Sequence, residues 1–168
     1  MLSRLPVFRV IPKWNYNPGS EVFPGFRRNL MTKPRNLVHV ENIPIRWGDM
    51  DAMGHVNNTV YFRYMEQARI AWLDATGCRG VDGRGHRMGP VIVTANCTFI
   101  RQLVYPGTVE VKTFVEPAGR TSMQTACELR MAGDDALYAE GGAKIVWMDY
   151  SEGKSCPLPE PLRALCPV

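Results

Sequence analysis

The spacing of apolar residues along this chain of 168 residues changes from a helical period to a strand period after residue 77, and that change limits the possible folds. From Asn58 to Gly77 the spacing matches one broad helix face, which predicts a helix of about four to five turns. The predicted face consists of Val60, Tyr61, Tyr64, Met65, Ala68, Ala71, Trp72 and Ala75. Asn57 or Asn58 can cap its start, and Gly77 suits the left-handed residue at its end. After the Gly- and Arg-rich segment 77–89 the period falls to two, as in strands with one buried face.

Turn residues at 106–107, 117–120 and 133–135 divide this second region into four strands. Short connections of this kind require antiparallel pairing, so the four strands are predicted to form a meander. Alternation at 43–47 adds a leading strand, and the adjacent Gly141 and Gly142 suggest a β-bulge in the last strand. The pattern predicts an α+β domain, in which an antiparallel sheet of about five strands covers one long helix with its concave face. Because the convex face and the edge strands then need a partner, we expect a homo-oligomer.

The net charge of +4 is concentrated at one end of the chain. Residues 1–40 hold seven of the 20 basic groups but one of the 16 acidic groups, which leaves 13 basic and 15 acidic groups, a net charge of −2, on the rest. A folded body with this balance is not expected to bind nucleic acid. No apolar run approaches the roughly 20 residues that a membrane-spanning helix needs, so no membrane partner is expected either.

Both ends of the chain lie outside the periodic region. Residues 1–37 are predicted to be a basic, irregular extension, with a translation start at Met31 and an organelle-targeting segment as alternatives. Residues 38–158 are predicted to form the domain, and residues 159–168 an irregular tail. The five cysteines include no CxxC pair, which favours a reducing compartment and a cytoplasmic location. Cys97 falls within a strand pattern and is expected to be a core thiol rather than a nucleophile.

The segment 47–69 carries the residues best suited to chemistry. Asp49 and Asp51 lead through a turn at Gly54 to His55 and then to the start of the helix. A carboxylate next to a helix N-terminus lies beside backbone N–H groups that the helix leaves unpaired. This pairing suits attack on a carbonyl whose oxygen becomes negatively charged.

These positions belong to a longer pattern, Asp49-x-Asp51-x-x-Gly54-His55-Val56-Asn57-Asn58, then Tyr61-x-x-Tyr64-x-Glu66-x-x-Arg69. With the strand and turn layout over residues 38–158, the pattern resembles the 4-hydroxybenzoyl-CoA thioesterase family of hotdog-fold acyl-CoA thioesterases. The resemblance implies a sheet wrapped around a central helix, dimers or tetramers with active sites at subunit interfaces, and hydrolysis of acyl-CoA thioesters. It implies no metal and no organic cofactor, because coenzyme A is part of the substrate.

The same resemblance assigns two catalytic roles. Asp51 falls on the catalytic aspartate, and Asn58 falls on the residue whose backbone N–H binds the oxyanion. The aspartate could attack the thioester carbonyl to form a mixed anhydride or deprotonate a water molecule, and the sequence leaves both routes open. One N–H donor to a developing oxyanion is typically worth about 3–4 kcal/mol in the transition state. Gly54 lets the backbone bring Asp51 back to the helix start and is predicted to lie against the substrate.

The neighbouring residues receive less specific roles. His55 either orients substrate or water or is bonded to the backbone, and Asp49 is expected to shape the loop as an acceptor. Tyr61 is predicted to lie against the substrate. Arg120 with Ser122, at a turn between strands, is the first candidate pair for the phosphates of coenzyme A.

Glu66 is a competing carboxylate, because another branch of hotdog thioesterases places its acid on the helix. It lies eight residues beyond Asn58. That is about 12 Å along the axis at 1.5 Å per residue, too far for both groups to act on one carbonyl within a subunit. An ion pair with Arg63 or Arg69 is therefore its expected role.

The leading interpretation is a thioester hydrolase that cleaves acyl-CoA to free acid and coenzyme A and assembles as a homodimer or homotetramer. The alternatives are hydrolysis of acyl groups on acyl carrier protein, and a non-catalytic acyl-CoA-binding hotdog protein. Docking of acyl carrier protein needs a basic patch, which the net charge of the folded body does not indicate. A hotdog dehydratase pairs a catalytic histidine with an acid in a different motif, which His55 alone does not reproduce.

Overall fold

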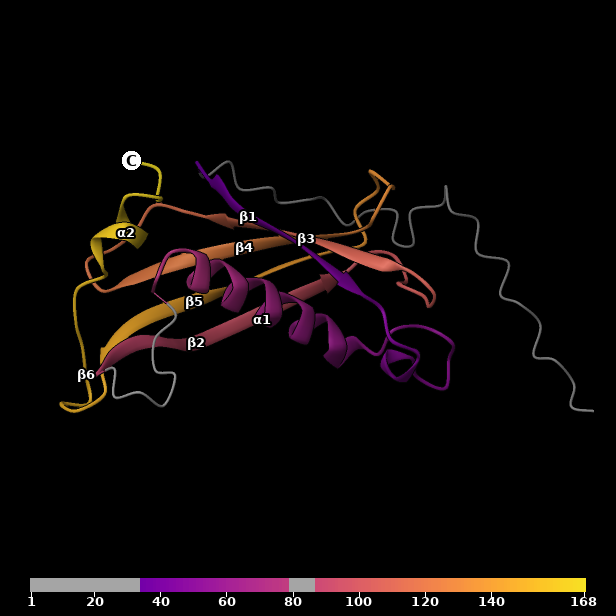
Figure 1. Cartoon of the computed structure of the whole chain (residues 1–168), viewed down its shortest axis with the longest axis horizontal. Helices are drawn as coiled ribbons and strands as arrows, with labels where there is room; N and C mark the ends of the chain where they lie inside the picture. Colours follow the sequence, from indigo (N-terminus) through magenta and orange to yellow (C-terminus); the bar gives the residue numbers. More distant parts are fainter. Residues whose placement is uncertain (1–33, 79–86) are drawn as a thin grey trace, which may run out of the picture.

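The computed structural model describes residues 34–78 and 87–168. In chain order the elements are β1 (Asn36–Pro44), a short 3-10 helix η1 (Trp47–Asp49), α1 (Asn58–Ala75), β2 (Met88–Phe99), β3 (Thr108–Val115), β4 (Ser122–Met131), β5 (Ala139–Asp149), β6 (Lys154–Ser155) and α2 (Glu160–Arg163). The predicted extension, apart from its last residues, and most of the Gly- and Arg-rich segment lie outside the described residues. The strands form one antiparallel sheet, and α1 lies across one of its faces (Figure 1). The α+β architecture is therefore confirmed.

The strand order differs from the predicted meander. The order is β1-β3-β4-β5-β2, so β2 pairs with β5 at the far edge instead of following β3. The reason lies in the β2–β3 connection, which is not a tight hairpin. Leu103 in this connection is fully buried, and its carbonyl accepts the Val56 N–H at 2.9 Å. The connection therefore crosses the end of the sheet beneath the start of α1 before Gly107 turns into β3.

The helix α1 has nearly the predicted bounds because its end signals are local. The Asn57 side chain accepts the Thr59 N–H at 2.9 Å and caps the start, and Gly77 follows the end with φ +69°. The buried residues are Val60, Tyr61, Tyr64, Met65, Ala68, Trp72 and Leu73. The predicted face is confirmed except at its C-terminal end, where Ala75 is exposed and Leu73 is buried instead. Within the described part of the chain, neither helix is long and apolar enough to cross a membrane.

The two central strands carry the alternation that the sequence predicted. On β3 and β4 every second residue is buried against α1, and the intervening ones are half-buried on the other face. The inward set is Val109, Val111, Thr113, Val115, Met123, Thr125, Cys127 and Leu129. Each large apolar side chain removed from water in this way contributes about 1.5–3 kcal/mol. The strands therefore hold α1 in one position over the sheet.

The predicted bulge at Gly141 and Gly142 is wrong, because the pairing of β5 runs through both residues without a shift. The irregularity lies in β2, between Ile92 and Thr94. The glycines serve close packing instead. A Cβ on Gly141 would collide with the carbonyl oxygen of Asn96 and lie 3.0 Å from the Met65 sulfur, which comes from α1.

The predicted irregular tail is also wrong. Leu158 and Leu162 are buried in the cluster around Trp72, and α2 begins directly after Pro159. The proline within its first turn is compatible with a helix because the N–H groups there have no intrahelical partner. The ordered domain therefore extends beyond residue 158.

We expect Gly142→Ala to destabilise the protein by about 1–3 kcal/mol, since the added methyl group meets the backbone carbonyl of Thr125, which cannot move without breaking the sheet. Urea unfolding followed by circular dichroism measures the effect. Gly48→Ala is the matched control, because nothing lies within 4 Å of a Cβ at that position. Equal stability of the two variants would contradict the packing role.

Candidate active site

The acidic segment forms a small hairpin directly before α1. Met50 and Val56 make an antiparallel bridge, and the Asp51 N–H donates to the His55 carbonyl at 2.8 Å. Gly54 sits at the reversal with φ +82°, a conformation that other residues rarely adopt. One pair further along, the Asn57 N–H donates to the Asp49 carbonyl at 2.9 Å. The hairpin therefore folds the Asp51 backbone back toward the first residues of the helix, as predicted from the position of Gly54.

Asp49 fixes this hairpin to the body of the domain. Its Oδ2 accepts the Tyr64 hydroxyl at 2.9 Å and the Arg46 N–H at 2.8 Å. Burial and the neighbouring Asp49 carboxylate raise the pKa of Tyr64, so its hydroxyl remains a donor at neutral pH. These contacts are those of the loop-shaping acceptor expected for Asp49.

Asp51 has a different environment. Its side chain is half-buried, and Oδ1 accepts the Met53 N–H at 2.8 Å, which fixes the orientation of the carboxylate. Oδ2 has no hydrogen-bond partner among the described residues. One oxygen therefore holds the group in place while the other is available to a substrate or a water molecule.

Asn58 is the first residue of α1, and its side chain is exposed. Its N–H finds no acceptor in residues 34–78 and 87–168, as expected for the first turn of a helix. Since Asn57 pairs with Asp49 across the hairpin, this donor lies at the same end of the molecule as Asp51. The structure thus places a carboxylate with one unbonded oxygen and an unpaired backbone N–H at the same end of α1.

His55 and Tyr61, the other residues of the pattern with a predicted role, differ in burial and in their hydrogen bonds. The His55 ring is half-buried and makes no side-chain hydrogen bond within the described chain, while its carbonyl binds Asp51. Tyr61 is 3% exposed, and its hydroxyl accepts the Leu103 N–H at 3.1 Å. Its ring packs edge-on against Phe99 with centroids 5.0 Å apart, and burial raises the pKa of its phenol. Tyr61 therefore holds the β2–β3 connection against α1, a structural position rather than an open substrate contact.

The candidate pair for coenzyme A lies at the opposite end of the sheet. The hairpin adjoins the Thr108 end of β3, whereas the turn that bears Arg120 and Ser122 follows the Val115 end. These two ends are seven residues apart, about 23 Å at 3.3 Å per residue. One chain therefore does not bring the pair together with Asp51.

A cleft of about 470 Å³ lies at this second end, between the β3–β4 turn and β5. Its lining consists of Glu116, Pro117, Gly119, Ser122, Met123, Gln124 and Lys144. Arg120 does not line the cleft, and its carbonyl accepts the Arg163 guanidinium at 2.8 Å. Ser122 and Gln124 alternate with the inward-facing Met123, so the cleft opens on the face of the sheet away from α1.

Two further expectations concern isolated side chains. The predicted ion pair of Glu66 with Arg63 or Arg69 is wrong, because neither pair forms in the described structure. Cys97 faces α1, and burial raises the pKa of its thiol to about 12, so it is not a thiolate at neutral pH. In the described ranges no three His, Cys, Asp or Glu side chains lie together as a metal site would need.

The long helix embraced by an antiparallel sheet, with an acidic hairpin at the N-terminus of the helix, defines a hotdog-fold thioesterase-like protein. The model of the thioesterase-like superfamily matches residues 45–165, and the chain belongs to this superfamily. The matched range includes α2, in agreement with its place in the core. A comparison with curated proteins gave no match.

Solved structures share this fold over nearly their whole length. The PA2801 protein from Pseudomonas aeruginosa, provisionally assigned as a thioesterase, is 40% identical with a TM-score of 0.71, over 76% of this chain and 97% of that one. A protein from Xanthomonas campestris, provisionally assigned as an acyl-CoA thioesterase, is 37% identical with a TM-score of 0.59, over 67% and 94%. The gentisyl-coenzyme A thioesterase BH1999 is 25% identical with a TM-score of 0.65, over 75% and 98%.

We expect Tyr64→Phe to lower the free energy of unfolding by about 1.5–3 kcal/mol, because it removes a hydrogen bond to a carboxylate and keeps the ring. Urea unfolding measures this loss. Tyr105→Phe is the matched control, since that side chain is 47% exposed and its hydroxyl has no bond to any described residue. Equal losses in the two variants would show that the Asp49–Tyr64 bond does not anchor the hairpin.

Proposed function

We propose that this protein hydrolyses acyl-CoA thioesters to a free acid and coenzyme A, with Asp51 as the catalytic carboxylate. The proposal is supported by the half-buried Asp51 carboxylate, held through one oxygen, and by the unpaired N–H of Asn58 at the start of α1, both at the hairpin end of the helix. A thioester carbonyl between these groups meets an attacking oxygen on one side and an oxyanion donor on the other.

Two routes use this arrangement. In the first, an oxygen of Asp51 attacks the thioester carbon, coenzyme A leaves as its thiolate, and water hydrolyses the resulting mixed anhydride to the acid and free Asp51. In the second, Asp51 takes a proton from water while that water attacks the carbonyl. In both, the Asn58 N–H donates to the carbonyl oxygen as it gains charge. Thiolate is a good leaving group, so neither route needs a strong general acid.

The relatives support coenzyme A as the carrier of the acyl group. One is named a gentisyl-coenzyme A thioesterase, and another is provisionally assigned to acyl-CoA substrates. Within the superfamily, we place the chain in the 4-hydroxybenzoyl-CoA thioesterase family, because of the spacing from Asp49 to Arg69. Hydrolysis of acyl groups on acyl carrier protein and simple acyl-CoA binding remain the competing functions. His55, with its ring unpaired within the described chain, is a candidate to orient substrate or water.

A homodimer or homotetramer remains part of the proposal, as does a cytoplasmic location. Both outer strands of the sheet, β1 and β2, have one edge without a partner strand among the described residues. Assembly through such an edge is a common way to protect it. A second subunit would also bring its own β3–β4 turn, so that Arg120 and Ser122 could reach a substrate bound at the Asp51 of the other subunit.

We expect Asp51→Asn to abolish most thioester hydrolysis, with kcat/KM lower by about 10²–10⁴-fold, because the variant loses the charge needed for attack or proton transfer. Its amide oxygen can still accept the Met53 N–H, so the hairpin keeps its shape. Release of free thiol, followed with a thiol-reactive dye over short, medium, long and aromatic acyl-CoAs, measures turnover.

Asp49→Asn is the control for this substitution. An amide oxygen in the place of Oδ2 can accept the same two hydrogen bonds, so this variant should retain most of its turnover. Full activity of folded Asp51→Asn would refute the assignment. A wild-type protein that binds acyl-CoA without releasing thiol would favour the binding function. Activity limited to acyl groups on acyl carrier protein would show that this carrier, and not coenzyme A, presents the thioester.

A further inference from the structure

Arg69 on α1 is a half-buried cation that no group of the described chain neutralises. It makes no hydrogen bond or ion pair with any described residue, Glu66 included. Burial lowers the pKa of its guanidinium, and the nearby thiol of Cys127 is neutral because burial raises the pKa of that group as well. A cation in this position is costly unless an anion from outside the chain pairs with it.

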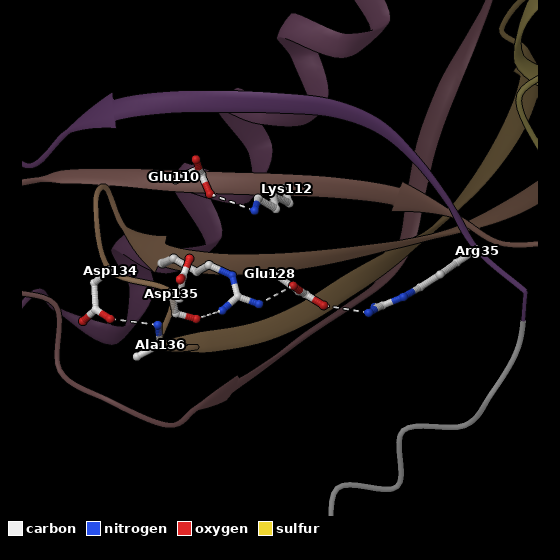
Figure 2. A network of polar contacts seen from close by, with 8 residues as sticks. Arg35, Glu110, Lys112, Glu128, Asp134, Asp135 and Ala136 are labelled. Atoms are coloured by element: carbon white, nitrogen blue, oxygen red, sulfur yellow. Dashed lines mark hydrogen bonds and ion pairs between the residues drawn. The ribbon is translucent and has the colours of Figure 1, made fainter. Parts of the chain in front are cut away.

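Arginines on the outer face of the sheet, away from α1, have acidic partners within the chain. There Glu128 accepts Arg35 at 2.6 Å and Arg130 at 2.7 Å (Figure 2). Although burial opposes ionisation, the two arginines hold the pKa of Glu128 below its usual range. The half-buried Arg130 is thus matched by an acid of its own chain, whereas the half-buried Arg69 is not.

Arg69 lies in line with the candidate oxyanion donor at the start of the helix. One stripe of the α1 surface joins residues at successive spacings of four, three and four: Asn58, Phe62, Met65 and Arg69. The two inner members are apolar, and Phe62 is 37% exposed. A chain that starts at the Asn58 N–H and follows this stripe therefore passes apolar side chains and ends at a cation.

Further apolar groups lie beside the stripe. Phe99 on β2 is 41% exposed, and its ring packs on Tyr61, the residue before Phe62. The sulfur of Met65 lies close to β5 at Gly141. The stripe therefore faces the flank where β2 and β5 meet, and an alkyl chain placed there would remove apolar surface from water, which favours binding.

A second donor without an acceptor lies one turn beyond Arg69. The indole Nε1 of Trp72 is buried and has no hydrogen-bond partner among the described residues. Buried donors in folded proteins are normally paired. Two neighbouring donors of α1 thus lack acceptors in this chain, and a carboxylate brings two acceptor oxygens and the charge that Arg69 lacks.

Given the thioesterase function proposed for Asp51, we propose that Arg69 determines specificity by binding a carboxylate at the far end of the acyl chain. The preferred substrates are then CoA thioesters of dicarboxylic acids. The planar fork of a guanidinium suits a carboxylate, which it can bind through two hydrogen bonds.

The helix sets the length of such an acyl group. Arg69 lies eleven residues beyond Asn58, about 16 Å along the axis at 1.5 Å per residue. Helical side chains lean toward the N-terminus, so the guanidinium lies closer to Asn58 than its Cα does. An extended chain covers about 1.2 Å per bond, which gives an acyl chain of about 8 to 14 carbons.

Pairs of acyl-CoAs of equal length test the specificity, one member ending in a methyl group and the other in a carboxylate. In the wild type, thiol release should give the higher kcat/KM for the carboxylate-ended member within the expected range of lengths. Arg69→Met keeps an unbranched side chain without the charge. It should lower the ratio of the two kcat/KM values at least about 30-fold, the effect of leaving one member of a charge pair without its partner. Arg69→Lys should restore part of this ratio.

Arg63→Met is the matched control. Arg63 is an exposed arginine of the same helix without an ion pair to any described residue, so its loss should leave the ratio unchanged. Calorimetry with the same acyl-CoA pairs measures binding separately from turnover. It compares Asp51→Asn with the double variant Asp51→Asn/Arg69→Met, and only the former should prefer the carboxylate-ended member. Sedimentation velocity shows whether Arg69→Met assembles like the wild type.

Equal hydrolysis and equal binding of both members by protein with an intact Arg69 would overturn the role of Arg69 and leave the thioesterase function standing. A carboxylate preference in binding that disappears with Arg69→Met would support it even in a protein that releases no thiol, a result that would refute the proposed hydrolysis instead. An Arg69→Met protein that keeps the preference would overturn the role. So would one that loses both substrates equally together with its assembly, since Arg69 would then serve the structure.

Discussion

The hydrogen bond from the Tyr64 hydroxyl to the Asp49 carboxylate joins the acidic hairpin to the second turn of α1, and the candidate site depends on it. The hairpin is also held by the buried Val56 side chain and by the Val56 N–H bond to the Leu103 carbonyl, but neither of these contacts fixes the Asp49 carboxylate. The buried ring of Tyr64 gives the bond a fixed position, because α1 itself is packed on β1 and β3. The Asp49 carboxylate thus has a structural role as a hydrogen-bond acceptor. Asp51, two residues on, keeps one carboxylate oxygen unbonded.

Much of the fold could be predicted from the sequence because its signals are local. The bounds of α1 follow from an asparagine cap, a glycine end and a helical period, all within a stretch of about 20 residues. The place of β2 could not be predicted in this way. Its alternation is compatible with pairing to β3 or to β5, and the choice is made by Leu103, which needs a buried position under α1. The packing role of Gly141 and Gly142 cannot be predicted for the same reason. Both glycines lie close to the backbone of neighbouring strands, and Gly141 also lies close to Met65 on α1, and these contacts exist only in the folded domain.

The residues of the candidate site likewise separate into those that a local pattern predicts and those that depend on the tertiary fold. Asp51, Gly54 and Asn58 lie within eight positions of one another, so a single hairpin is enough to place them at the same end of α1. Arg120 and Ser122 come from the far end of β4, and no local pattern could show that the sheet separates them from the hairpin. The spacing of Glu66 and Arg69 predicted an ion pair that the structure does not form. Spacing alone brings two side chains to the same flank of a helix, but burial and neighbouring groups decide whether they meet.

The two apolar clusters of the core become complete at different points of the chain, which has a consequence for folding during synthesis. The cluster under the start of α1, next to the hairpin, draws on residues up to Ala139. The cluster around Trp72 also needs Leu158 and Leu162. A nascent chain can therefore complete the half of the core that supports Asp51 before Leu158 and Leu162 emerge to cover the cluster around Trp72, and α2 packs last. During that interval the growing polypeptide exposes part of the apolar cluster around Trp72 at one end of a largely folded domain.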